Sequence, residues 1–294
     1  HECGVELAVM EAGLGGRFDA IRVFAPELVL FTPMGMDHAR ILGPTLADIA
    51  RDKAQALAPG GLGLTGFQPP EALAELEARA DEAGAELRRV EISGDLPPVG
   101  LPGPHQRGNA ALARAAWREL AVRHGWAVRP EAEAAALARA FIPGRFQRID
   151  DHAPRLILDG AHNPPALTVL RDALAAAGVV PAALIFACMA DKDLDAMLPL
   201  VAGLTPGPVF CPDIPGCARL LRPEVLAARL GPRARPVADL PSALAAARAE
   251  SGDSGPDGAP VLVCGSLYLA AEFYRLHPRL LGRFSGADAP QGAR

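Results

Sequence analysis

The stretch 11–20 reads E-A-G-L-G-G-R-F-D-A and combines three glycines with the carboxylates of Glu11 and Asp19 and the guanidinium of Arg17. The apolar run 5–10 before it is typical of a buried parallel strand that would end at Glu11. Glycine lets the backbone approach a ligand closely, and ligands of open α/β sheets bind beyond the carboxyl ends of the strands. The stretch is therefore a candidate site for a polar ligand. The alternative is a glycine turn with Glu11 and Arg17 as a surface ion pair.

A second apolar run, 28–34, ends just before Asp37 and His38, and Thr45 is then placed to cap a helix over 45–58 that carries Lys53. One glutamate, one histidine and one lysine do not by themselves make a convincing metal site, because magnesium prefers oxygen ligands. Of the 29 basic residues, only positions 53 and 192 are lysine. Lysine, unlike arginine, is able to lose its proton and react. Both lysines are therefore candidates for a reactive or catalytic role. The alternative is that these two positions are lysine by chance.

These two stretches, 11–20 and G-M-D-H-A-R-I-L-G-P-T-L-A-D-I-A-R-D-K-A at 35–54, resemble the dihydrofolate synthase / folylpolyglutamate synthase family. Members of this family are ATP-dependent amide ligases of the Mur ligase superfamily. The resemblance implies that Glu11 and His38 bind Mg²⁺ and that Lys53 is carbamylated. It also implies catalytic roles for His38 and Arg17, and places Arg17 and Asp19 at the pteridine or glutamate substrate. The chain departs from the family after this motif, where Ile21-Arg22 replace T-N.

Further motifs extend the resemblance along the chain. They are H-Q-R-G-N-A at 105–110, P-G-R-F-Q at 143–147, L-D-G-A-H-N-P at 158–164, D-K-D at 191–193 and G-S-L-Y at 265–268. The resemblance implies that seven residues bind ATP, namely Gln106, Asn109, Arg145, Asp159, His162, Lys192 and Ser266. His105, which opens the first of these motifs, is a further candidate. Helix capping, solvated charges and exposed helix starts are the structural alternatives for these residues.

Alternating strand-like and helix-like segments predict an α/β fold. The resemblance divides it into the remainder of a parallel-sheet, Mur-ligase-type central ATP-binding domain at 1–141, a Rossmann-like α/β ligase domain at 142–284, and a disordered tail at 285–294. Strands are expected near 5–10, 28–34, 61–66, 86–92, 182–188, 208–211, 234–237 and 261–265. Helices are expected near 45–58, 69–83, 105–122 and 131–141.

The sequence contains no G-x-x-x-x-G-K-[ST] motif, whereas the family grips the ATP phosphates with a P-loop in its N-terminal portion. The expectation is therefore a fragment of a ligase, or a truncated protein. The ligase would use ATP to add L-glutamate to dihydropteroate or to folate (poly)glutamates through an acyl phosphate. The alternatives are a Mur ligase of cell-wall precursor synthesis and a catalytically silent nucleotide-binding module.

The charge and the apolar content of the chain exclude some classes of binding partner. The net charge of −5 argues against a nucleic-acid or anionic-membrane surface, and no apolar run reaches membrane-spanning length. Five cysteines without a C-x-x-C pair predict reduced thiols in a cytoplasmic protein. The expected partners are small molecules, namely ATP with Mg²⁺, dihydropteroate or folate, and L-glutamate. The resemblance implies a monomer at full length.

Overall fold

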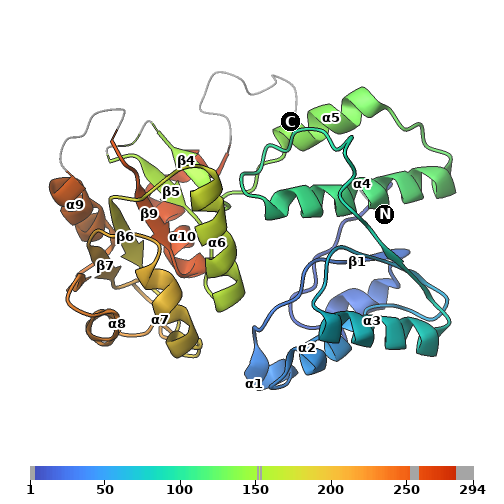
Figure 1. The fold of residues 1–294 in the computed structure, drawn as a ribbon, viewed down its shortest axis with the longest axis horizontal. Coiled ribbons are helices and arrows are strands. Elements are labelled where there is room, and N and C mark those ends of the chain that lie inside the picture. Colours follow the sequence, from blue (N-terminus) through green and yellow to red (C-terminus); the bar gives the residue numbers. More distant parts are fainter. Residues whose placement is uncertain (1–3, 151, 153, 252–257, 283–294) are drawn as a thin grey trace. The chain divides into compact units, whose positions relative to one another are not determined.

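The computed structural model describes residues 4–150, 152, 154–251 and 258–282 (Figure 1). It divides into two compact units, one formed by 1–97 with 107–135 and the other by 98–106 with 136–294. Both units are α/β, as the sequence predicts. The domain ranges 1–141 and 142–284 stay predictions, and the tail 285–294 lies outside the described residues.

A three-stranded parallel sheet forms the centre of the first unit, in the order β1-β2-β3. Its strands are β1 (Leu28–Phe31), β2 (Leu62–Thr65) and β3 (Glu86–Arg89). Its helices are α1 (Ala39–Leu42), α2 (Leu46–Ala54), α3 (Pro70–Ala83), α4 (His105–His124) and α5 (Pro130–Arg139), with a 3-10 helix at Ala20–Phe24. Each predicted element from 28 onward is present with shorter or shifted ends.

The sheet of the first unit is covered on both faces. On one face, Phe31 packs with Ala54 and Leu57, at and after the end of α2, and with Leu76 of α3. On the other face, α4 packs against β2 through a separate cluster of buried residues. Buried strands with apolar residues on both faces are typical of parallel sheets.

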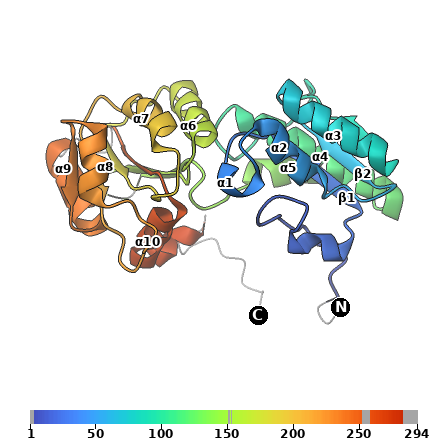
Figure 2. The same ribbon diagram turned by 90° about the horizontal axis from the view of Figure 1, so that it is seen from below.

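The prediction of a strand over 5–10 is wrong. These residues form no strand, and Val5, Leu7, Val9 and Met10 are all strongly exposed. A strand exists only through hydrogen bonds to a neighbour, and β1 pairs with β2 alone among the described strands. The segment instead runs outside the sheet, in dark blue in Figure 2.

A six-stranded sheet forms the centre of the second unit, in the order β4-β5-β9-β6-β7-β8. Its strands are β4 (Gln147–Ile149), β5 (Leu156–Leu158), β6 (Ala183–Phe186), β7 (Val209–Pro212), β8 (Ala234–Val237) and β9 (Val261–Cys264). All neighbours are parallel except β4 and β5. The sequence analysis did not anticipate the three-residue antiparallel strand β4.

Helices cover both faces of the second sheet. They are α6 (Pro164–Ala176), α7 (Leu194–Ala202), α8 (Pro223–Leu230), α9 (Leu240–Ser251) and α10 (Leu267–Leu276). Residues of α6, α7 and α8 share one buried cluster, and residues of α9 and α10 share the other. Alternate residues of β5, β6, β7 and β9 enter opposite clusters, such as Leu184 and Ile185 of β6. The carboxyl ends of β5, β9 and β6 therefore lie side by side along one edge of the sheet.

Candidate active site

Arg145 lies in a tight turn between α5 and β4. The residues on either side have left-handed backbones, with φ +67° at Gly144 and φ +49° at Phe146. Glycine takes this conformation freely, but phenylalanine at positive φ costs about 1–3 kcal/mol. Burial of the Phe146 ring in the core holds that residue in place. The turn thus presents the exposed Arg145 side chain from a fixed backbone.

Asp159 follows β5 and ties this turn to the sheet edge. Its Oδ2 accepts a hydrogen bond from the Phe146 amide at 2.8 Å, and its Oδ1 accepts one from the Ala161 amide at 2.8 Å. Burial raises the pKa of Asp159, while these two amides and the charges of Arg145 and His162 oppose the rise. The carboxylate therefore braces the turn and lies close to Arg145 and His162, both of which are predicted to bind ATP.

Gly160 and His162 complete this group. A Cβ at Gly160 would lie 2.6 Å from Nη1 of Arg145, so the guanidinium rests against the bare backbone at this position. Nδ1 of His162 lies 2.7 Å from the Gly160 carbonyl oxygen. A carbonyl only accepts, so Nδ1 carries the proton, and in the neutral ring Nε2 is the acceptor. The structure therefore brings Arg145, Asp159 and His162 together.

His105 approaches the same group from the segment 98–106. Its ring lies against Gly103, where a Cβ would be 2.7 Å from the ring and φ is +108°. Burial, and then the charge of Arg145, lower the pKa of His105. Its Nδ1 is buried without a hydrogen-bond partner among the described residues. A neutral imidazole therefore lies within the field of Arg145.

Ser266 follows β9, the parallel neighbour of β5, and Lys192 follows β6, the next strand of the sheet. The Ser266 side chain is buried, and its Oγ accepts a hydrogen bond from the Tyr268 amide at 3.0 Å, which caps α10. Lys192 is half-buried in the turn between β6 and α7. Helix capping is thus the role that the structure displays for Ser266, and contact of either residue with ATP stays a prediction.

Gln106 and Asn109 lie in the first turns of α4. Gln106 is buried and Asn109 half-buried. Residues three positions apart in a helix share a face, so the two amide side chains point to the same side of α4. Their contact with adenine stays a prediction.

In the first unit, the glycine-rich loop wraps the end of α2. The amides of Gly16 and Arg17 donate hydrogen bonds to Oδ1 of Asp52 at 2.9 Å and 3.3 Å. A Cβ at Gly16 would lie 2.5 Å from the Lys53 carbonyl oxygen, so this approach requires glycine. The sequence analysis missed Asp52; its signal was an acidic residue directly before the retained lysine.

Asp19 closes the same loop. It accepts hydrogen bonds from the amides of Leu14 at 2.9 Å and Ile21 at 3.0 Å. The Ile21 and Leu14 amides lower the pKa of Asp19, and the charge of Lys53 adds to this effect. The Arg17 side chain is exposed and lies over the Phe18 ring. The loop thus brings Asp19 into the field of Lys53, while substrate contact by Asp19 and Arg17 stays a prediction.

The residues expected to bind metal are Glu11 and His38, and both are exposed. Nε2 of His38 lies 3.7 Å from Oδ2 of Asp37. Among the described residues, no three His, Cys, Asp or Glu side chains cluster in a way that could hold a metal ion. One carboxylate and one imidazole fall short of the oxygen ligands that Mg²⁺ takes. These side chains alone therefore do not amount to a magnesium site.

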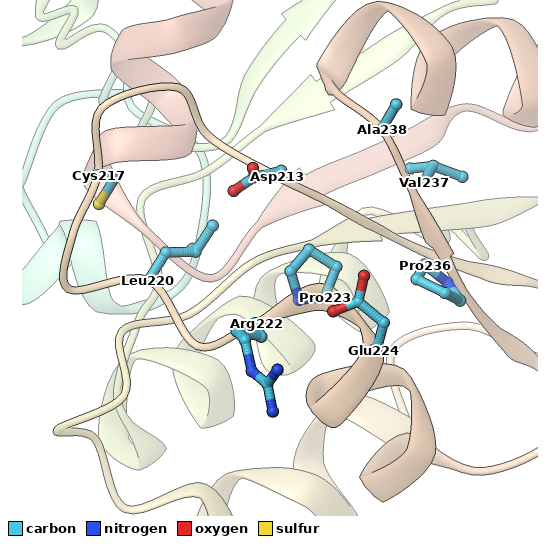
Figure 3. Close-up of a pocket in the computed structure, with 9 residues that line it drawn as sticks. All are labelled: Asp213, Cys217, Leu220, Arg222, Pro223, Glu224, Pro236, Val237 and Ala238. Atoms are coloured by element: carbon cyan, nitrogen blue, oxygen red, sulfur yellow. The ribbon is translucent and has the colours of Figure 1, made fainter.

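A pocket of about 550 Å³ lies elsewhere in the second unit, beyond the ends of β7 and β8 (Figure 3). Its lining consists of Asp213, Cys217, Leu220, Arg222, Pro223, Glu224, Pro236, Val237 and Ala238. None of the predicted site residues lines it. We place the candidate site at β5, β9 and β6 instead, because the residues with matching chemistry converge there.

The chain is similar in sequence to known ligases. The model of the family "Mur ligase, glutamate ligase domain" matches residues 144–267. The folylpolyglutamate synthase of Lacticaseibacillus casei is 30% identical over 91% of this chain and 66% of its own length. The dihydrofolate synthase/folylpolyglutamate synthase of Bacillus subtilis is 32% identical over 58% of this chain and 45% of its own length.

Solved structures give the same result. A Mycobacterium tuberculosis folylpolyglutamate synthase complexed with ADP and AMPPCP matches with a TM-score of 0.80 and 27% identity, over 94% of this chain and 69% of that one. E. coli FolC in complex with DHPP and ADP matches with a TM-score of 0.77 and 28% identity, over 91% of this chain and 65% of that one. The chain spans two thirds or less of the length of the curated relatives it matches. On these similarities, the chain belongs to the folylpolyglutamate synthase / dihydrofolate synthase family of the Mur ligase superfamily.

Proposed function

We propose that the protein is an ATP-dependent amide ligase that adds L-glutamate to dihydropteroate, to folate (poly)glutamates, or to both. In this reaction ATP phosphorylates the pterin-linked carboxylate, which yields an acyl phosphate and ADP. The amine of L-glutamate then attacks the acyl carbon, and phosphate leaves. The proposal extends to this chain what the names and bound ligands of its relatives say of those proteins.

One observation carries the proposal, namely the convergence of Arg145, Asp159 and His162 at the edge of the second sheet. A planar guanidinium suits phosphate oxygens, because its donors match their spacing. Preorganised donors of this kind stabilise the charge that develops as a phosphoryl group is transferred. Lys192, Ser266, Gln106, Asn109 and His105 are further proposed contacts of the nucleotide.

Residues of the first unit carry further roles in the proposal. We propose that Lys53 is carbamylated, that His38 and Arg17 assist catalysis, and that Arg17 and Asp19 face the substrate. Mg²⁺ belongs to the proposal through Glu11 and His38, and a carbamate at Lys53 would add the oxygen atoms that these two side chains lack. When bound, the metal would neutralise phosphate charge.

The proposed partners are therefore small molecules: ATP, L-glutamate and a pterin-linked acid. No helix among the residues that the structure describes is long and apolar enough to span a bilayer. A cytoplasmic location and a monomeric state are also part of the proposal. The four cysteines within the described residues are free thiols.

The test is ADP release by the native protein at its natural length. We expect release that requires both dihydropteroate or folate and L-glutamate. Release with UDP-muramoyl substrates instead would favour a cell-wall ligase, and nucleotide binding without any turnover would favour a silent module.

Lys53→Arg provides a separate test of the carbamate. Arginine keeps the charge and the length of the side chain but forms no carbamate at neutral pH. We expect turnover of the variant to fall by about two orders of magnitude. Native mass spectrometry should show an adduct of roughly 44 daltons, the mass of CO₂ on a reactive amine, on Lys53 of the wild-type protein and none on the variant. Near-normal turnover of Lys53→Arg would rule out the carbamate.

A further inference from the structure

We propose that Gln147 and Tyr274 are positioning residues that hold the Arg145 turn in its nucleotide-binding geometry, although neither is among the proposed ligand contacts. The inference rests on the proposed function, because it assigns the task of Gln147 and Tyr274 through Arg145. It starts from a hydrogen-bonded cluster behind the turn that the predicted site residues do not explain.

Gln147 lies at the centre of this cluster. Its side chain is buried, and its Oε1 accepts hydrogen bonds from the Gly144 amide at 3.1 Å and from the Tyr274 hydroxyl at 2.5 Å. Its Nε2 donates to the Leu280 carbonyl oxygen at 2.9 Å. An amide only donates through its N–H and a carbonyl only accepts, so the two backbone partners fix the orientation of the Gln147 side chain.

Tyr274 fixes Gln147 from the opposite side. The tyrosine is buried on α10, and burial raises its pKa to about 12. The hydroxyl therefore stays protonated at every pH at which the protein would work and remains a donor to Oε1. Its ring packs in the same core cluster as Phe273 and Ala270. Helix α10 thus reaches the Arg145 turn through one buried hydroxyl.

The turn itself needs such support. Left-handed backbone conformations flank Arg145 on both sides, at Gly144 and at Phe146. The Gly144 carbonyl accepts from the Gly160 amide at 2.8 Å, and Asp159 accepts from the Phe146 amide. The Gly144 amide donates to Oε1 of Gln147. The turn is therefore held from the sheet edge on one side and from Gln147 and Tyr274 on the other.

The distances around Gly144 show that its neighbours do not crowd it. A Cβ at Gly144 would meet the Tyr274 hydroxyl at 3.6 Å and the Ala270 Cβ at 3.9 Å, which are ordinary contacts. The position is thus restricted by its backbone conformation and hydrogen bonds rather than by crowding. Preorganised side chains of this kind raise ligand affinity because the ligand does not have to order them.

The experiment is a double-mutant cycle in the native protein, with the affinity for AMPPCP and the KM for ATP as readouts. Tyr274→Phe keeps the ring and removes the hydroxyl. We expect it to weaken AMPPCP binding about five-fold, the effect of one hydrogen bond. Arg145→Ala should weaken binding about thirty-fold, the effect of a charged contact. In the Arg145→Ala background, Tyr274→Phe should have no further effect, because its action passes through Arg145.

Thr205→Val is the matched control. Thr205 is buried in the same unit, and its hydroxyl donates to the Pro181 carbonyl oxygen at 2.6 Å and accepts from the Gly207 amide at 2.9 Å. The control also removes a buried hydroxyl, so it should lower the melting temperature comparably while AMPPCP binding stays unchanged. Gln147→Met removes the acceptor itself and serves as the second variant should Tyr274→Phe fail to fold; we expect at least the same loss of affinity.

The outcomes separate the inference from the proposed function. Absence of AMPPCP binding in the wild-type protein would overturn the proposed function and the inference with it. Wild-type binding with equal effects of Tyr274→Phe in both backgrounds, or with an effect no larger than that of Thr205→Val, would overturn the inference alone.

Discussion

At the scale of single residues, the candidate site depends on the absence of a side chain at Gly160. Gly160 leaves room for Nη1 of Arg145 and for Cδ2 of Leu267, each within 2.7 Å of where a Cβ would stand. Both of these atoms are ends of flexible side chains, and the Gly160 backbone is not left-handed. A methyl group here would therefore displace the guanidinium without breaking the fold.

We accordingly expect Gly160→Ala to weaken AMPPCP binding by the native protein about ten-fold, the loss of part of a charged hydrogen bond. Its melting temperature should change by no more than about 2 °C, because the added methyl is met by movable atoms. Gly94→Ala is the control, since a Cβ there would meet nothing within 4 Å. Equal binding by both variants would show that Arg145 does not contact the nucleotide.

At the scale of elements, the packing of α5 on α4 depends on one buried carboxylate. Glu133 is only 9% exposed and receives two hydrogen bonds from Arg118, at 3.0 Å and 2.8 Å. These bonds, and then the charges of Arg118 and Arg114, lower the pKa of Glu133 against a smaller opposing effect of burial. A carboxyl whose pKa is lowered by folding stabilises the fold above its ordinary pKa of 4.5, and that contribution is lost as the pH falls through the folded-state value.

Glu133→Gln should therefore destabilise the first unit by about 2 kcal/mol at pH 7, and the difference from wild type should shrink as the pH is lowered below 4.5. Tryptophan fluorescence during urea unfolding measures this unit selectively, because both tryptophans, Trp117 and Trp126, belong to it. Glu131→Gln, at an exposed position of the same helix, should have little effect. A difference that persists unchanged at pH 3.5 would exclude the ion pair as its source.

The elements also show what the sequence was able to predict. Strands flanked by helices, such as β6 and β9, were predictable because a short apolar run bounded by turn residues is typical of a buried strand. The run 5–10 has the same pattern and forms no strand, because pairing depends on a neighbour that local sequence does not describe. Strand β4 was missed because three residues are too few to show an alternation of apolar and polar side chains. The residues of the L-D-G-A-H-N-P motif were found by resemblance, whereas Gln147 and Tyr274 lie 127 positions apart, and only the fold joins them.

At the scale of the whole molecule, two places in the second unit compete for a small ligand. One is the edge formed by β5, β9 and β6, where Arg145, Asp159 and His162 meet. The other is the pocket at β7 and β8 (Figure 3). The β5, β9 and β6 edge brings charged side chains together, whereas the pocket at β7 and β8 provides an enclosed volume. Ligands of phosphate chemistry are held by charge and oriented donors, which favours the first.

Amide hydrogen exchange of the native protein, with and without AMPPCP, tests this choice. We expect AMPPCP to slow exchange at 144–147 and 159–163, because a bound phosphate chain would fix the Arg145 turn and the loop after β5, and local opening is what exchange measures. Exchange at 213–224 and 236–238 should stay the same. In Gly160→Ala the protection at 144–147 should fall, since the guanidinium is displaced. Protection confined to 213–224 and 236–238 would instead assign the nucleotide to the pocket and remove Arg145 from the site.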